Sequence, residues 1–164
     1  MKKILIFGSS GRLGSYLVKE LKSFFCIYSI GKKNNKYKVN LLKFREVYEI
    51  INLINPDLII NCAASTNVNK CIKNYSYGFK GNVLIPRNIV QAIKKKNKKI
   101  YVIHFSTDQI YNGKQNKKNK ETDVKLSNNY SKTKFLGELE IKKLKYHTII
   151  RTNFFGKLNL GYSS

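Results

Sequence analysis

A tyrosine and a lysine in the second half of the chain have the spacing of a proton-transfer pair. Residues 130–134 read Tyr-Ser-Lys-Thr-Lys, and residues four apart share one face of an α-helix. The ammonium of Lys134 can therefore lower the pKa of Tyr130 by stabilising its phenolate. A tyrosine needs such help to exchange protons near neutral pH. Because a lysine-rich chain often contains this pattern by chance, its meaning depends on the motifs around it.

A glycine-rich turn near the N-terminus is the first of these motifs. Gly8, Gly11 and Gly14 follow the apolar run Ile4 to Phe7 directly and open a stretch of helical periodicity. In such a turn the first glycine permits the tight bend, the second leaves room for a pyrophosphate, and the third lets helix and strand pack closely. The helix N-terminus adds free N–H groups and a positive dipole end. We predict that this turn binds a dinucleotide.

The elements that must position these residues alternate along the chain. We expect strands at 4–7, 26–30, 58–60, 100–105 and 148–150, and helices over 13–24, 47–54, 81–96 and from about 129 to 144. Phe24 and Leu139 belong to the apolar positions expected to face inward. Strand and helix in turn predict an α/β fold of the Rossmann type, a doubly wound parallel sheet with helices on both faces. A third motif, Ser106-Thr107-Asp108, follows the fourth strand, at the edge where such sheets bind ligands.

The end of the second predicted strand bears on which dinucleotide binds. An acidic residue there would bind the ribose 2′-hydroxyl of NADH and repel the 2′-phosphate of NADPH. The sequence has Gly31 at this position, followed by Lys32 and Lys33. This permits NADPH and mildly favours it, with NADH as the alternative. The two lysines are equally well explained as part of a generally basic surface.

These segments together resemble the extended short-chain dehydrogenases, and among them the dTDP-4-dehydrorhamnose reductases. The glycine spacing, residues 56–68, the Ser-Thr-Asp motif and the Tyr-x-x-x-Lys motif carry the resemblance in this order. It implies NADPH-dependent reduction of the 4-keto group of a nucleotide-linked deoxysugar, as in dTDP-rhamnose biosynthesis. It also implies that Tyr130 donates the proton, that Thr107 hydrogen-bonds the carbonyl oxygen, and that Lys134 holds the ribose and tunes Tyr130.

The same resemblance implies the remaining site residues. Asn69 and Ile72 stand where the family usually has acids, and Phe154 stands where it often has a tryptophan against the substrate, with core packing as an equal alternative. The implied substrate contacts are Thr66, Thr107, Asp108 and Phe154. The implied cofactor contacts are Gly8, Ser10, Gly11, Arg12, Leu13, Gly14, Gly31, Asn40, Leu41, Cys62, Ala63, Ala64, Phe105, Tyr130 and Lys134.

Members of the family continue with a C-terminal part that builds much of the sugar-nucleotide site. We therefore expect residues 1–164 to form a single NAD(P)-binding Rossmann domain without the substrate lobe. Whether it is a fragment or a shortened product, and whether it is active alone, stays open. A missing lobe would leave apolar surface and a sheet edge uncovered, which favours association and leaves a homodimer open.

Two other functions stay open from the sequence. One is a different sugar-nucleotide epimerase or dehydratase, although dehydratases usually carry a second acid where Gln109 stands. The other is a non-catalytic regulatory subunit that binds dinucleotide. The presence of Tyr130 and Lys134 argues against a regulatory subunit, whereas the shortness of the chain argues for it.

Composition sets broad limits on partners. The formal charge is +23, but only four of the 32 basic residues are arginines, and no nucleic-acid motif is present, so we expect no nucleic-acid partner. Three cysteines and two histidines show no metal-ligand spacing, so we expect reduced thiols and no metal. The sequence has no membrane-length apolar run, and we expect a cytoplasmic protein without membrane contact.

Overall fold

The centre of the protein is a five-stranded parallel sheet, seen in a computed structural model that describes residues 1–31, 37–111 and 120–153. The strands are β1 (Lys3–Phe7), β2 (Cys26–Ile30), β3 (Leu58–Asn61), β4 (Tyr101–Thr107) and β5 (His147–Thr152). Their order is β2-β1-β3-β4-β5, so the direction of winding reverses between β1 and β3. Ligands of open α/β sheets bind outside the carboxyl ends of the strands at such a reversal.

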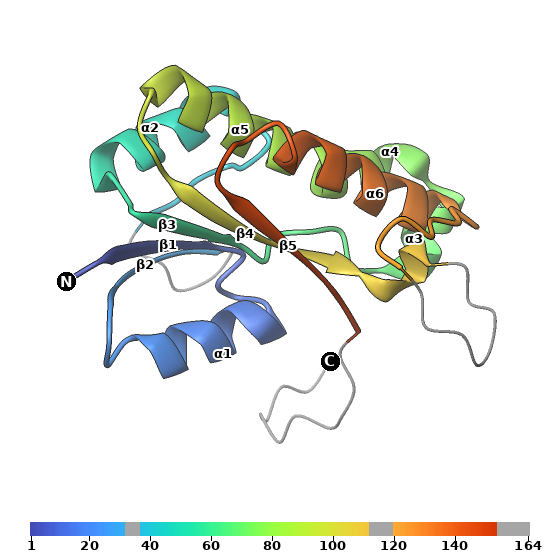
Figure 1. Cartoon of the computed structure of the whole chain (residues 1–164), viewed down its shortest axis with the longest axis horizontal. Helices are drawn as coiled ribbons and strands as arrows, with labels where there is room; N and C mark the ends of the chain where they lie inside the picture. The colour runs from blue at the N-terminus through green and yellow to red at the C-terminus, as the bar shows by residue number, and fades with distance from the viewer. Residues whose placement is uncertain (32–36, 112–119, 154–164) are drawn as a thin grey trace.

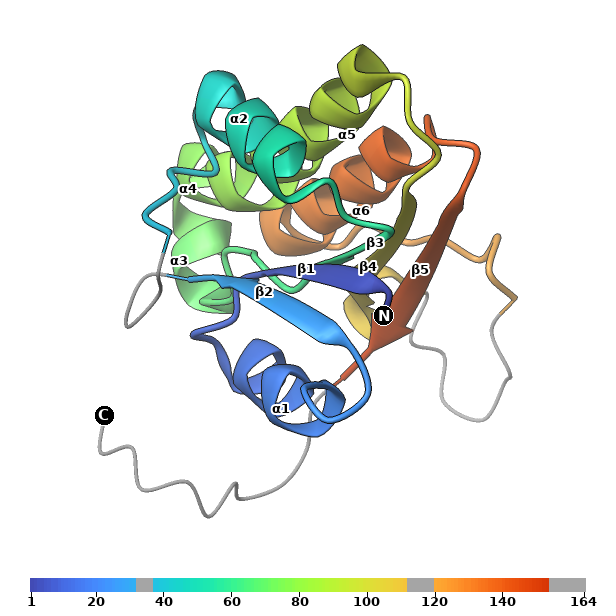
Figure 2. The ribbon, with the colours of Figure 1, turned by 90° about the vertical axis from the view of Figure 1, so that its left-hand side faces the viewer.

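Helices cover both faces of this sheet, as predicted (Figure 1). Helix α1 (Arg12–Leu21) lies on one face, and α2 (Phe44–Ile54), α5 (Ile85–Lys96) and α6 (Asn129–Ile141) lie side by side on the other (Figure 2). The core follows from the alternation of side chains along each strand. Leu5 and Phe7 point to the three-helix face, whereas Ile4 and Ile6 point toward α1. The Rossmann-type doubly wound sheet is therefore confirmed.

Two short helices that the sequence analysis did not predict lie between β3 and α5. They are α3 (Val68–Lys73) and α4 (Tyr75–Phe79), and a π-helical turn, Lys80–Leu84, joins α4 to α5. Asparagine caps start both helices: Asn67 accepts a hydrogen bond from the Lys70 N–H, and Asn74 from the Tyr77 N–H. Such caps were the available sequence signal, because asparagine is favoured at helix N-termini.

Two residues expected to face inward are exposed instead. Phe24 is 70% exposed because α1 ends at Leu21, and Leu139 is 41% exposed. The reason at Leu139 is that α6 buries mainly polar residues, which helical periodicity of apolar residues cannot reveal. The buried polar and charged residues of α6 are Ser131, Thr133, Lys134, Glu138 and Glu140.

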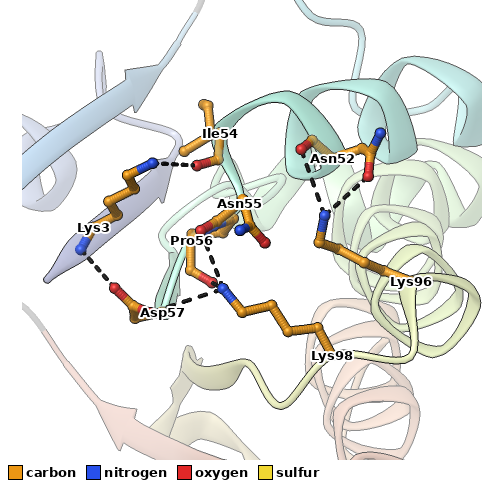
Figure 3. A network of polar contacts seen from close by, with 8 residues as sticks. All are labelled: Lys3, Asn52, Ile54, Asn55, Pro56, Asp57, Lys96 and Lys98. Carbon is orange, nitrogen blue, oxygen red and sulfur yellow. Dashed lines mark hydrogen bonds and ion pairs between the residues drawn. The ribbon is translucent and has the colours of Figure 1, made fainter.

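Polar contacts close the amino-terminal edge of the sheet (Figure 3). The Lys3 backbone N–H donates to Asp57 Oδ2 over 2.9 Å, and Lys98 Nζ lies 3.8 Å from Asp57 Oδ1. Lys96 Nζ donates to Asn52 Oδ1 over 2.9 Å. These contacts join β1 and the segment between α5 and β4 to Asp57, and they join α5 to α2.

The described part of the chain contains no helix long and apolar enough to cross a membrane. Within the same residues, no three His, Cys, Asp or Glu side chains are grouped so that they could hold a metal ion. On the α1 side, β4 and β5 present exposed Tyr101 and Ile150. The expected association through uncovered surface stays a prediction.

Candidate active site

The glycine turn after β1 has a geometry that only glycine allows at two positions. Gly8 has φ of 79°, and its N–H donates to Ile30 O over 2.8 Å, which ties the turn to the end of β2. A Cβ on Gly8 would lie 2.6 Å from the backbone N of Ala63, and a Cβ on Gly14 would lie 2.3 Å from Gly8 O. The turn is thus packed between the first turn of α1 and the loop after β3.

The space beside Gly11 fits a pyrophosphate. Gly11 is the N-cap of α1 and provides no side-chain cap, and the first turn of α1 has no acidic residue. A Cβ placed on Gly11 would meet a single nearby atom, Gly8 O at 3.3 Å, so the side facing away from the turn is open. An uncapped, positive helix end beside an open glycine is the arrangement that binds phosphate groups. The residues present therefore fit a dinucleotide.

The loop after β3 forms the other side of this turn. Cys62, Ala63 and Ala64 are half-buried, and the Ala63 N–H donates to Asn61 Oδ1 over 3.1 Å. The Cys62 N–H donates to Phe7 O over 2.9 Å, which continues the β1–β3 pairing up to the turn. Small side chains let this backbone approach Gly8.

Thr107 and Tyr130 meet at the carboxyl edge of the sheet. Thr107 ends β4, and Tyr130 is the second residue of α6, whose start is fixed by a capping box between Asn128 and Ser131. Both side chains are buried, and a hydrogen bond from Thr107 stabilises the ionised form of Tyr130. Thr107 Oγ1 also lies 3.3 Å from Asp108 Oδ1. The structure thus brings together residues that are 23 positions apart in the sequence.

Lys134 lies one helical turn after Tyr130 on α6 and contacts β4. Its Nζ donates to the Phe105 carbonyl over 2.7 Å, and only 4% of the residue is exposed. Burial lowers the pKa of Lys134 to about 8, against the opposing effects of Glu138, Cys62 and Cys71. The same lysine is close enough to Cys62 to act on its thiol, whose pKa burial raises to about 12. Lys134 therefore links α6 to the end of β4.

The expected effect of Lys134 on the tyrosine is wrong in this structure. The pKa of Tyr130 is raised, first by burial and also by the nearby Cys71 and Asp108, while the hydrogen bond from Thr107 lowers it. Lys134 is not among the causes of the shift. The physical reason is that the tyrosine has lost most of its contact with water, while the ammonium donates to the Phe105 carbonyl.

Asn82, which the sequence analysis missed, holds α6 against the loop after β3. It lies in the π-helical turn and is 2% exposed. Its Oδ1 accepts from the Ser65 N–H over 2.9 Å, and its Nδ2 donates to Thr133 Oγ1 over 3.1 Å. A Cβ on Gly137 would lie 2.1 Å from Asn82 O, so α6 passes very close to this turn. The signal was an asparagine inside a helical pattern, which needs a side-chain partner when buried.

A buried ion pair fixes the other end of α6. Glu138 accepts two hydrogen bonds from Arg151, over 2.9 Å from Nε and 2.7 Å from Nη2. Arg151 Nη1 also donates to Glu121 O over 2.8 Å, and the guanidinium lies 5.0 Å from the Tyr111 ring centroid. One arginine thus joins β5, α6 and residues on both sides of the segment 112–119.

The other predicted site residues lie on the glycine turn, at the start of α1, and in the loops after β2 and β3, or outside the described chain. Asn40 N–H donates to Glu46 Oε2 over 2.7 Å, and Leu41 O accepts from Asn88 Nδ2 over 2.9 Å. Gly31 follows β2 and is half-buried. Ser10 and Arg12 are exposed on the turn and at the start of α1, Leu13 is half-buried, and Thr66 is exposed after β3. Phe154 lies outside the described residues.

Comparison with known proteins places this geometry in a family. The family model described as the RmlD substrate binding domain matches residues 1–159. The chain belongs to this family. The dTDP-4-dehydrorhamnose reductase of Aggregatibacter actinomycetemcomitans is 33% identical to this RmlD-family chain over 132 residues, which are 76% of the chain and 41% of the reductase.

Solved structures agree with this assignment. The crystal structure of a dTDP-4-dehydrorhamnose reductase ortholog from Clostridium acetobutylicum has a TM-score of 0.82 at 31% identity, covering 96% of this chain and 55% of its own. A dTDP-4-dehydrorhamnose reductase from Bacillus anthracis, in complex with NADP, has a TM-score of 0.81 at 25% identity, covering 92% and 52%. The RmlD-family chain spans about half the length of these relatives. The predicted resemblance is therefore confirmed.

Proposed function

We propose that this chain is the cofactor-binding and catalytic part of an NADPH-dependent reductase of a nucleotide-linked 4-keto deoxysugar. The observation that carries the proposal is the junction of Thr107, Tyr130 and Lys134 at the carboxyl edge of the sheet, one loop away from the glycine turn. The relatives named dTDP-4-dehydrorhamnose reductases, one of them solved with NADP, support it.

In this proposal two residues act on the substrate carbonyl, and the others hold the cofactor or the sugar. When bound, the dihydronicotinamide supplies the hydride that the carbonyl carbon receives. Tyr130 donates its phenolic proton to the carbonyl oxygen, so that a secondary alcohol forms, and Thr107 hydrogen-bonds the same oxygen as negative charge develops. The raised pKa of Tyr130 keeps the phenol protonated before the reaction. Lys134 holds the ribose, and Asp108 and Thr66 contact the sugar.

The cofactor is NADPH, with NADH as the alternative. Gly31 occupies the position where an acidic residue would repel the 2′-phosphate of NADPH. Glycine has no side chain there that could exclude this phosphate. Residues 1–164 form one Rossmann domain in this proposal, and the sugar nucleotide needs further protein to complete its site. The proposed compartment is the cytoplasm.

Fluorescence titration of the purified chain with NADPH tests the binding half of the proposal. We expect saturable binding, and its absence from a protein with a folded circular dichroism spectrum would reject the proposal.

Y130F in a full-length reductase that contains this domain tests the catalytic half. We expect kcat to fall by about 10²- to 10⁴-fold with little change in NADPH affinity, because proton donation is lost and cofactor contacts stay. Turnover that persists would remove Tyr130 as the proton donor.

A further inference from the structure

A buried pair of polar side chains lies directly behind the loop that packs on the glycine turn. Asn61, the last residue of β3, is paired in register with His104 of β4. The two residues are 1% and 2% exposed, and Asn61 Nδ2 lies 3.0 Å from His104 Nδ1. Both lie in a sheet whose neighbouring buried positions are mostly aliphatic, so their polarity needs a reason.

The hydrogen bonds fix the chemical state of the histidine ring. The backbone N–H of Ala63 is a donor, so the Asn61 atom that receives it is the carbonyl oxygen, at 3.1 Å. The amide NH₂ of Asn61 must then face the ring, and His104 Nδ1 must accept. The ring is consequently neutral, with its proton on Nε2. Burial and the nearby Lys134 cation both hold the pKa of His104 well below its ordinary value, which agrees with this state.

Packing alone does not explain a histidine at this position. Among the residues that the structure describes, His104 Nε2 has no hydrogen-bond partner, and a buried N–H without a partner costs free energy. A phenylalanine or leucine would fill a similar space without that cost. What only the imidazole supplies is an acceptor that orients the Asn61 amide.

We propose that His104 is a positioning residue for the dinucleotide site, acting through Asn61 on the loop Cys62–Ala64. His104 orients the Asn61 amide, and Asn61 Oδ1 then holds the Ala63 N–H. The Ala63 backbone is in turn the surface against which Gly8 packs, since a Cβ on Gly8 would lie 2.6 Å from Ala63 N. A change at His104 therefore moves the loop Cys62–Ala64, which packs against the glycine turn of the dinucleotide site. The effect on cofactor affinity rests on the proposed function, whereas the effect on the loop does not.

H104F, which keeps a ring but removes the acceptor, tests the inference, and H147F is its matched control. His147 is the first residue of β5 and so lies at the amino end of the sheet, away from the glycine turn. Its Nδ1 lies 2.7 Å from Leu144 O, so H147F also removes one histidine hydrogen bond. We expect the Kd for NADPH to rise about tenfold in H104F and to stay within about twofold in H147F. Equal Kd values for folded H104F and the wild type would overturn the inference.

A double-mutant cycle separates positioning from general damage. If His104 acts through Asn61, then N61L weakens NADPH binding, and adding H104F to N61L has no further effect on the Kd. Additive effects of the two substitutions would contradict the inference. The unfolding midpoint of each variant, measured in urea, shows that the titrations compare folded proteins.

Nitrogen-15 NMR of the wild-type ring makes the test independent of variant folding and of cofactor binding. We expect a neutral ring with the proton on Nε2 at neutral pH. A protonated Nδ1 would overturn the inference. The amide resonances of Gly8 and Ala63 should shift in H104F and not in H147F. If the wild type failed to bind NADPH, the proposed function would fall, and these signals would still decide the role of His104.

Discussion

Replacing Arg151 by methionine should destabilise the protein strongly, because it leaves a buried carboxylate without its partner. Glu138 has a side-chain exposure of 0%, and Arg151 one of 9%. Both carboxylate oxygens of Glu138 receive hydrogen bonds from Arg151, at 2.9 and 2.7 Å. R151M removes both donors and leaves the negative charge in a place from which water is excluded.

The expected loss is about 3 to 5 kcal/mol of unfolding free energy, the range found when one partner of a buried ion pair is removed. A domain of this size is stabilised by roughly 5 to 15 kcal/mol, so this loss is a substantial fraction of the total stability. The double variant E138L/R151M should recover most of this loss, since it removes the buried charge together with its partner.

Urea denaturation followed by circular dichroism measures this loss, with R87M as the matched control. Arg87 pairs with Glu140 over 3.1 Å, but its side chain is 39% exposed, so R87M should cost no more than about 1 kcal/mol. The reasoning would be refuted if R151M and R87M had the same unfolding midpoint, or if the double variant were no more stable than R151M.

Two further predictions concern the site. G14A places a Cβ 2.3 Å from Gly8 O, so we expect it to distort the glycine turn and to raise the Kd for NADPH by at least about tenfold; an unchanged Kd in titration would show that the turn relaxes without consequence. Lys134 has its pKa lowered from 10.5 to about 8, so the folded protein releases this proton while the unfolded chain keeps it, and stability rises with pH between about 8 and 10.5. The wild type should therefore gain about 3 kcal/mol over this range relative to K134M, and parallel curves of unfolding free energy against pH for the two proteins would contradict the assignment.

Much of the fold could be predicted because the burial of each strand or helix depends on the spacing of apolar residues within it. The runs Ile4–Phe7, Cys26–Ile30 and Leu58–Ile60 are strands of the sheet, as predicted. The predicted turn at Gly8 has a left-handed φ and packs closely against Ala63. Helices α3 and α4 were missed because they are short and carry little apolar periodicity. Leu139 was misplaced because α6 buries polar groups instead.

The sequence named the motif residues of the candidate site but not the electrostatics around them. Thr107, Tyr130 and Lys134 were named from motifs, and the structure places them together. Their catalytic roles stay predictions until Y130F is measured. The direction of the Tyr130 pKa shift was wrong, because a pattern of residues carries no information on how much water reaches each group.

The sequence by itself determined the alternation of strand and helix, the glycine turn and the identity of the motif residues, since these depend on local propensity and spacing. Only the tertiary structure decided which polar residues are buried and with whom they pair. Asn61 with His104, Asn82 with Thr133, and Glu138 with Arg151 are separated by 43, 51 and 13 positions. The free energy of burying such groups depends on partners brought by the fold, so no local pattern can specify it.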